Sequence, residues 1–165
     1  MAQITLKTAV PGDEKILAHI QTQSWKAAFG EILSPEMLAR CTDVSQAEEM
    51  YRHVLLHQLA DMTIELVDGQ PHAIAAWSRS REMRTDAAEL ICLHSLKSGW
   101  RQGYGSVLME HVLAEMTAAG YGEAVLWVFE ENLPARRFYE KHGFVPAGER
   151  KDSFGAAELL YHKKL

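Results

Sequence analysis

The chain has 165 residues, of which 47% are hydrophobic and 24% charged, and its 17 basic and 22 acidic side chains give a net charge of −5. We expect no nucleic-acid partner, because phosphate binding requires a basic surface. No apolar stretch approaches the roughly 18 residues of a membrane span, and the first residues lack the apolar centre of a signal peptide, so we expect no membrane association and a cytoplasmic protein. The length fits a single domain over residues 1–165, and Cys41 and Cys92 are expected as free thiols.

Residue patterns in the first half of the chain predict a short strand, a run of helices and a β-hairpin. Asp13, which follows the turn Pro11-Gly12, is placed to cap a helix that stops at Gly30, and Ser34 is placed to cap the next helix. Asp68-Gly69 between two apolar segments is typical of a two-residue hairpin turn. The expected elements are a strand at 5–10, helices from 13, from 34 and over 45–59, and strands at 62–67 and 73–78.

The middle of the chain carries a glycine loop between an apolar run and a helix. The run covers 90–96, the loop reads Trp100-Arg101-Gln102-Gly103-Tyr104-Gly105, and an amphipathic helix extends to about Ala119. Glycine lets the backbone approach a phosphate, and the free N–H groups at a helix start point at the anion. The loop alone is equally compatible with a tight turn that holds no ligand.

A second informative segment follows this helix. A buried-type strand is expected at 124–129 and a helix over 133–141, and segments 145–150 and 158–162 are expected to close the sheet as an antiparallel pair. The strand–helix–strand unit in the middle should be parallel, with a right-handed crossover. The order of elements therefore predicts a mixed α/β fold with helices flanking the sheet.

Together the two segments resemble the GCN5-related N-acetyltransferase (GNAT) superfamily. Its loop pattern, Gln/Arg-x-x-Gly-x-Gly/Ala, matches residues 100–105 except that Trp100 stands at the first position. Its second signature has an Asn, an Ala and the run Phe-Tyr-Glu-Lys-x-Gly-Phe, as found at Asn132, Ala135 and 138–144. The resemblance implies the acyl-CoA N-acyltransferase fold, in which a central, mostly antiparallel sheet contains one parallel, splayed strand pair and is flanked by helices.

The resemblance also implies an enzyme that moves an acetyl group from acetyl-CoA to a primary amine of a small molecule or peptide. Main-chain amides of the glycine loop would bind the pyrophosphate, and an amide on the preceding strand would polarise the thioester carbonyl. Whether the Arg101 side chain contacts a phosphate or is solvated stays open. The residues expected around acetyl-CoA are Leu93, Ser95, Leu96, Arg101, Gln102, Gly103, Tyr104, Gly105, Ser106, Asn132, Ala135 and Phe138.

Direct transfer of the acetyl group requires a proton donor for the thiolate and a proton acceptor for the amine. Tyr139 is the candidate general acid, because a phenol stays protonated at neutral pH. Glu89 and His94 are the candidates for the base, although an exposed strand-end carboxylate and a hydrogen-bonded core histidine explain them as well. Trp25 and Phe29 are candidates for the wall of the acceptor pocket, or else belong to the core.

Other functions remain open from the sequence. A module that senses acyl-CoA without turnover would keep the glycines but need no proton donor, and a protein N-terminal acetyltransferase would use the same chemistry on a peptide amine. A dinucleotide-binding fold is disfavoured, because Leu108 stands where a third glycine is needed. His53 and His57 have a spacing compatible with metal binding, yet a solvated helix face explains them better, and we expect no metal. A homodimer is possible.

Overall fold

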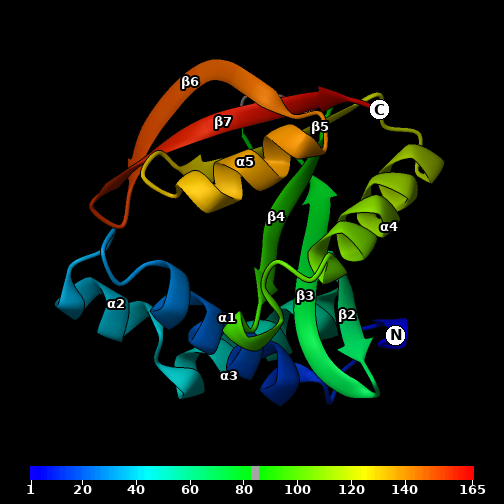
Figure 1. Cartoon of the computed structure of the whole chain (residues 1–165), viewed down its shortest axis with the longest axis vertical. Coiled ribbons are helices and arrows are strands. Elements are labelled where there is room, and N and C mark those ends of the chain that lie inside the picture. The colour runs from blue at the N-terminus through cyan, green and yellow to red at the C-terminus, as the bar shows by residue number, and fades with distance from the viewer. Residues whose placement is uncertain (83–85) are drawn as a thin grey trace.

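The computed structural model describes residues 1–82 and 86–165, whose strands form one twisted sheet with helices against both faces (Figure 1). The described elements are, in chain order, β1 (Ile4–Thr8), α1 (Glu14–Ala28), α2 (Pro35–Cys41), α3 (Val44–His57), β2 (Asp61–Val67), β3 (Gln70–Arg79), β4 (Ala88–Ser95), a short 3₁₀ turn η1 (Lys97–Gly99), α4 (Tyr104–Ala118), β5 (Glu123–Phe129), α5 (Leu133–Lys141), β6 (Val145–Ser153) and β7 (Ala156–Lys164).

The sheet has the strand order β1-β2-β3-β4-β5-β7-β6, and every neighbouring pair in it is antiparallel except β4 and β5. The parallel pair is joined through α4, as the sequence predicted. Its pairing is limited to Ala88 opposite Ala124 and Glu89 opposite Val125, so the two strands separate beyond these residues. This arrangement confirms the expected mixed, mostly antiparallel sheet with a splayed parallel pair.

Alternation along β3 divides the core between the two faces of the sheet. Ala73, Ala75 and Trp77 pack toward α4, whose Leu108, Met109, Val112 and Met116 are fully buried. Ile74 and Ala76 point to the other face and pack against apolar residues of α1 and α3. Successive side chains of a strand face opposite sides, so one strand supports both layers.

The helix starts show where local sequence rules hold. The side chains of Ser34, Asp43 and Asn132 each accept a hydrogen bond from a backbone N–H in the first turn of α2, α3 and α5. The expected cap at Asp13 is wrong. Its carboxylate instead accepts from Nζ of Lys7 and from the Val10 N–H, both at 2.9 Å, because the ammonium group of β1 competes for it. Asp13 therefore ties the start of α1 to β1.

Several boundaries differ from the expected ones. Helix α1 ends at Ala28, with Phe29 rather than Gly30 at its C-cap. The last two strands are longer than expected, because the tight turn Phe154-Gly155 joins them directly. Strand β3 begins at Gln70, directly after the Asp68-Gly69 turn, which the sequence predicted correctly.

Candidate active site

The opening between β4 and β5 is the centre of the candidate site. Beyond Glu89, β4 stays paired to β3 through Leu93, His94 and Ser95, while its other edge has no strand partner among the described residues. Backbone groups on that edge are therefore available to a ligand. A bulge at Ile91, between the pairs of Leu90 and Cys92 with β3, shifts the strand where the opening begins, two residues beyond the last pair with β5.

The loop after β4 presents a helix start that no side chain caps. Helix α4 has Gly103 at its N-cap, with φ 86°, and no side chain accepts from its first N–H groups. Arg101, two residues earlier, also has a positive φ of 65°. Left-handed residues in a turn direct N–H groups to one concave side, and the helix dipole adds positive potential there. The loop from 101 to 106 is therefore suited to an anion such as a pyrophosphate.

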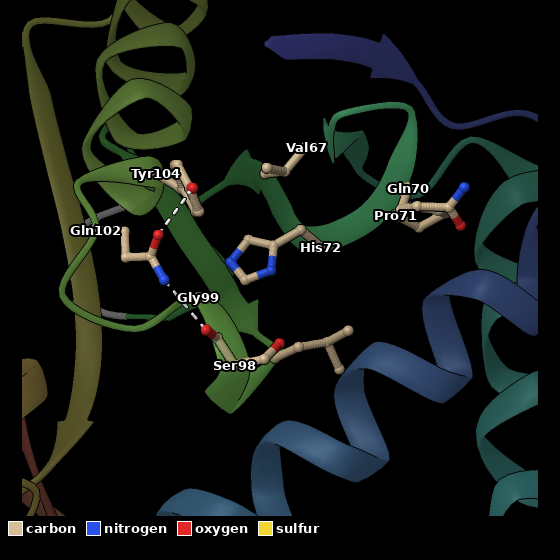
Figure 2. A pocket seen from close by; sticks show the side chains of 9 residues that line it. Val67, Gln70, Pro71, His72, Ser98, Gly99, Gln102 and Tyr104 are labelled. Carbon is tan, nitrogen blue, oxygen red and sulfur yellow. Dashed lines mark hydrogen bonds between the residues drawn. The ribbon is translucent and has the colours of Figure 1, made fainter. Parts of the chain in front are cut away.

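Trp100, Gln102 and Tyr104 make hydrogen bonds that fix the shape of this loop. Trp100 donates its indole N–H to the Ser95 carbonyl at 3.2 Å. Gln102 donates from Nε2 to the Ser98 carbonyl at 3.3 Å and accepts from the Tyr104 hydroxyl at 2.9 Å (Figure 2). Trp100, the departure from the family pattern, thus fastens the loop to the end of β4, and Gln102 joins the 3₁₀ turn to α4.

A buried histidine supports the loop from below, a feature that sequence reasoning missed. His72 is 6% exposed and meets Tyr104 edge to face, with ring centroids 5.4 Å apart. A Cβ on Gly99 would lie 2.2 Å from Cε1 of His72, so only glycine fits there. Burial lowers the pKa of His72, which favours the neutral ring. A hollow of about 300 Å³ lies beside the ring (Figure 2).

Three of the expected acetyl-CoA residues converge between α4, β4 and α5. A Cβ on Gly105 would lie 3.6 Å from the Phe138 ring and 4.0 Å from Leu93. Ser106 is hydrogen-bonded to Nε2 of His142 at 3.1 Å, which links the start of α4 to the end of α5. These contacts bring the glycine loop and the second sequence signature together, although they lie in separate parts of the chain.

Two further residues expected around acetyl-CoA, Leu96 and Asn132, already make hydrogen bonds within the chain. The Leu96 side chain packs on the α1 side, opposite to Leu93, and its N–H already donates to the His72 carbonyl at 3.0 Å. That amide is therefore not free for a ligand, which leaves residues 93–95. Asn132 caps α5 by accepting from the Ala135 N–H at 3.4 Å.

Tyr139 lies on α5 beside the opening, half-buried against the core under α4. Its ring meets Phe138 and Phe144 edge to face, with centroids 5.6 and 6.1 Å away. Burial raises the pKa of Tyr139 well above its usual value, and Cys92 on β4 acts in the same direction. Its hydroxyl has no hydrogen-bond partner among the described residues, so a protonated phenol is free to donate to a ligand.

Glu89 and His94 have partners that limit them as bases. Glu89 is 2% exposed, and its carboxylate pairs with the Arg81 guanidinium at 2.6 Å. Nε2 of His94 accepts the Trp25 indole N–H at 3.3 Å, and burial lowers the pKa of His94 to about 4. Both groups therefore have structural contacts that explain their polarity in a buried strand.

Aromatic rings from separate elements form a cluster beside the opening. Trp25 contacts Phe29 and Phe154 edge to face, with centroids 5.0 and 5.5 Å apart, and Phe29 contacts Phe129 at 5.0 Å. We call Trp25, Phe29, Phe129 and Phe154 the aromatic cluster. It joins the end of α1, the end of β5 and the turn between β6 and β7.

Glu158 on β7 lies next to this cluster. It stands directly opposite Phe129 in the β5–β7 ladder, so both side chains are on the sheet face that carries Phe29. The carboxyl is half-buried, and burial raises the pKa of Glu158. It makes no ion pair within 4 Å in the part of the chain that the structure describes, but Lys151, directly opposite it in the β6–β7 ladder, and a hydrogen bond from Ser153 offset part of this rise in pKa.

Within residues 1–82 and 86–165, no group of three side chains is arranged to hold a metal ion, and no helix is long and apolar enough to cross a membrane. His53 and His57 lie side by side on the exposed face of α3, with ring centroids 4.4 Å apart.

A sheet that opens beside an uncapped helix start fits the acyl-CoA N-acyltransferase class expected from the sequence. A family model described as the acetyltransferase (GNAT) family matches residues 24–144, more than half of the chain, and the chain therefore belongs to this family. It is an N-acetyltransferase that uses acetyl-CoA as cosubstrate.

Known proteins resemble the chain over most of its length. A Mycobacterium tuberculosis protein named probable N-acetyltransferase is 26% identical over 144 residues, which are 87% of this chain and 80% of the relative. The fold matches that of the PaiA N-acetyltransferase of Thermoplasma acidophilum in complex with coenzyme A, with a TM-score of 0.83, 19% identity and 99% of each chain covered. It also matches the ribosomal-protein-S18-alanine N-acetyltransferase of Escherichia coli, with a TM-score of 0.71, 19% identity and coverage of 98% of this chain and 94% of that one.

Proposed function

We propose that the enzyme acetylates a small primary amine, which enters between the end of α1 and the opened strands β4 and β5. The observation that carries this proposal is the aromatic cluster, because it builds a wall on the α1 side of the opening, opposite to α4 and α5. Aromatic rings bind the hydrocarbon part of an amine and attract an ammonium group through their faces. Acetyl-CoA and the amine would thus approach the opening from opposite faces of the sheet.

The residues present fit acetyl-CoA in two respects. The uncapped start of α4 and the left-handed residues Arg101 and Gly103 suit the pyrophosphate, whose oxygens accept from main-chain N–H groups. The free edge of β4 over 93–95 suits the thioester arm, since an N–H there can donate to the carbonyl oxygen as negative charge develops. Leu93, Gly105 and Phe138 would line the channel.

In this reaction the amine nitrogen forms a bond to the carbonyl carbon, and the carbon–sulfur bond breaks. The sulfur leaves with the electron pair, and we assign the proton it receives to the Tyr139 hydroxyl. The raised pKa of Tyr139 keeps the phenol protonated, so it donates a hydrogen bond to the sulfur first and the proton follows as the bond breaks.

We assign to the Glu158 carboxylate the binding and deprotonation of the acceptor's ammonium group. His94 uses its lone pair on Trp25, and Glu89 is paired with Arg81 at 2.6 Å, whereas Glu158 has only the hydrogen bond from Ser153 and the more distant charge of Lys151. A half-buried carboxylate beside aromatic rings attracts a cation, and its raised pKa makes it a better proton acceptor than an exposed one. The attraction would bring the ammonium form of the acceptor to the opening, and transfer of its proton to the Glu158 carboxylate would then leave the free amine for attack.

A panel of acceptors tests this function, with release of the coenzyme A thiol as the readout. It contains alkylamines, diamines and a peptide with a free N-terminal alanine. We expect turnover with small amines and, for Glu158→Gln, a raised KM for the amine with an unchanged KM for acetyl-CoA. Turnover with the peptide alone would favour a protein N-terminal acetyltransferase. Binding of acetyl-CoA without any turnover would favour an acyl-CoA sensor.

Two broader expectations join this proposal. We propose that residues 1–165 act as one domain, because strands from both ends of the chain belong to the same sheet. We also propose a cytoplasmic location, which the two free thiols, Cys41 and Cys92, and the use of acetyl-CoA support.

A further inference from the structure

Two hairpin turns in this chain have matching φ values but differ in the residue at their first position. In the β2–β3 turn, Asp68 and Gly69 have φ values of 50° and 78°. In the β6–β7 turn, Phe154 and Gly155 have φ values of 56° and 81°. Two positive φ values in a two-residue loop are the pattern of a type I′ turn, which favours Asn-Gly and Asp-Gly. The first turn follows this rule and the second does not.

Phenylalanine is a poor choice for the conformation of Phe154. A side chain with a Cβ is disfavoured in the left-handed region, and a bulky residue there cannot bond to its own backbone as Asp or Asn does. Phe154 is also 45% exposed, so its burial offsets only part of this cost. A strained residue persists where the surrounding structure or the function requires it.

The contacts of Phe154 indicate what the ring does. Its centroid lies 5.5 Å from that of Trp25, at an interplanar angle of 81°. Figure 1 shows the β6–β7 turn beside the segment that follows α1, so this turn reaches across the sheet to the N-terminal helices. The ring thereby completes the aromatic cluster at its open end, between Trp25 and solvent.

We propose that Phe154 is a specificity-determining residue, which the β6–β7 turn holds in a strained conformation so that its ring binds the hydrocarbon part of the acceptor amine. This inference rests on the proposed acceptor site. An amine with several methylene groups would place them against Phe154 and Trp25, whereas a shorter amine would not reach the ring. The residue therefore favours longer alkylamines over short ones.

Phe154→Asn separates function from stability, because it creates the preferred Asn-Gly turn while removing the ring. The probes are n-hexylamine and ethylamine at saturating acetyl-CoA. We expect kcat/KM for n-hexylamine to fall by about 10-fold, the effect of losing one or two methylene contacts, while ethylamine and the KM for acetyl-CoA stay within about 2-fold. We also expect the Tm to rise by about 2–5 °C as the strain is relieved.

Two matched variants serve as controls. Phe154→Tyr retains the ring and the backbone strain, so it should keep both the preference for n-hexylamine and the wild-type Tm. Asp68→Asn changes the equivalent residue of the other type I′ turn, where its side-chain oxygen can still accept from the Gln3 N–H, and should alter neither property.

The outcomes distinguish this inference from the proposed function. If the wild-type enzyme acetylates neither amine, the proposed function fails and this inference with it. If it acetylates both amines with equal efficiency, or if Phe154→Asn keeps the preference, only the role of Phe154 is overturned. A Tm that falls in Phe154→Asn would show that the ring supports the fold instead.

Discussion

Trp25 donates its indole N–H to Nε2 of His94, 3.3 Å away, and this bond joins α1 to β4 at the opening of the sheet. Because Nε2 accepts, the neutral imidazole carries its hydrogen on Nδ1. Burial lowers the pKa of His94 to about 4, so the ring stays neutral at physiological pH. His94 is thereby a positioning residue that holds Trp25 in the aromatic cluster.

Trp25→Phe tests this relationship, since it keeps an aromatic ring but removes the N–H. We expect the KM for the amine acceptor to rise by about 5- to 20-fold with the KM for acetyl-CoA unchanged, because the ring loses its fixed orientation. The unpaired nitrogen of His94 should cost about 1–3 kcal/mol of unfolding free energy. Steady-state kinetics and denaturant unfolding measure the two effects. A parallel rise of both KM values would place Trp25 outside the acceptor site.

Tyr139→Phe removes the hydroxyl and retains the packing against Phe138 and Phe144. We expect kcat to fall by on the order of 10- to 1000-fold, with the affinity for acetyl-CoA nearly unchanged. Because the pKa of Tyr139 is raised far above its ordinary value, the wild-type enzyme should show no loss of kcat from Tyr139 ionisation up to pH 9. Rapid-quench or steady-state assays decide the matter, and an unchanged kcat would mean that water or another group protonates the thiolate.

Gly99→Ala places a Cβ 2.2 Å from the buried His72 ring, so either the ring or the loop must move. We expect a loss of about 1–3 kcal/mol in unfolding free energy from overpacking, and a KM for acetyl-CoA raised by about 10-fold as the loop shifts. His72→Ala in the same chain makes room for the Cβ. The double variant should therefore be less destabilised than the sum of the two single variants, and strict additivity would exclude a shared steric cause.

The sequence predicted those elements whose signals are local. Helix α5 begins and ends where expected, because Asn132 caps it, Pro134 sits in its first turn and Gly143 follows with a positive φ. The Asp68-Gly69 hairpin turn was equally predictable from the sequence. The splayed strands followed from the family resemblance, since no local pattern shows where two parallel strands separate.

Features that depend on distant partners were not predictable in the same way. Asp13 has the sequence context of a cap, but Lys7 of β1 competes for its carboxylate. Gly99 is required only because His72, from another strand, fills the space where its Cβ would lie. Phe154-Gly155 lacks an ordinary turn residue at its first position, so the long β6–β7 hairpin was underestimated. The sequence signal that could have located this turn was Gly155, directly after an aromatic residue.

Glu65 on β2 introduces a pH dependence of stability that is independent of the acceptor site. Its side chain is 0% exposed, and neither carboxylate oxygen has a hydrogen-bond partner among the described residues. It stands opposite Leu6 on β1 and Ala73 on β3, on the face that packs toward α4. Burial raises the pKa of Glu65 from 4.5 to about 7. The folded state therefore favours the protonated carboxyl, which carries no buried charge.

The folded protein binds one proton more than the unfolded chain between pH 4.5 and about 7, so Glu65 makes stability fall as the pH rises through this window. Glu65→Gln is neutral at every pH and removes the effect. Relative to this variant, the wild type should lose about 2–3 kcal/mol of unfolding free energy between pH 5 and pH 8. Guanidinium unfolding of both proteins at pH 5, 6, 7 and 8 measures the difference, with Glu65→Asp as a control that retains an ionisable group. Parallel stability curves for the wild type and Glu65→Gln would show that the Glu65 carboxyl titrates alike in the folded and unfolded chains.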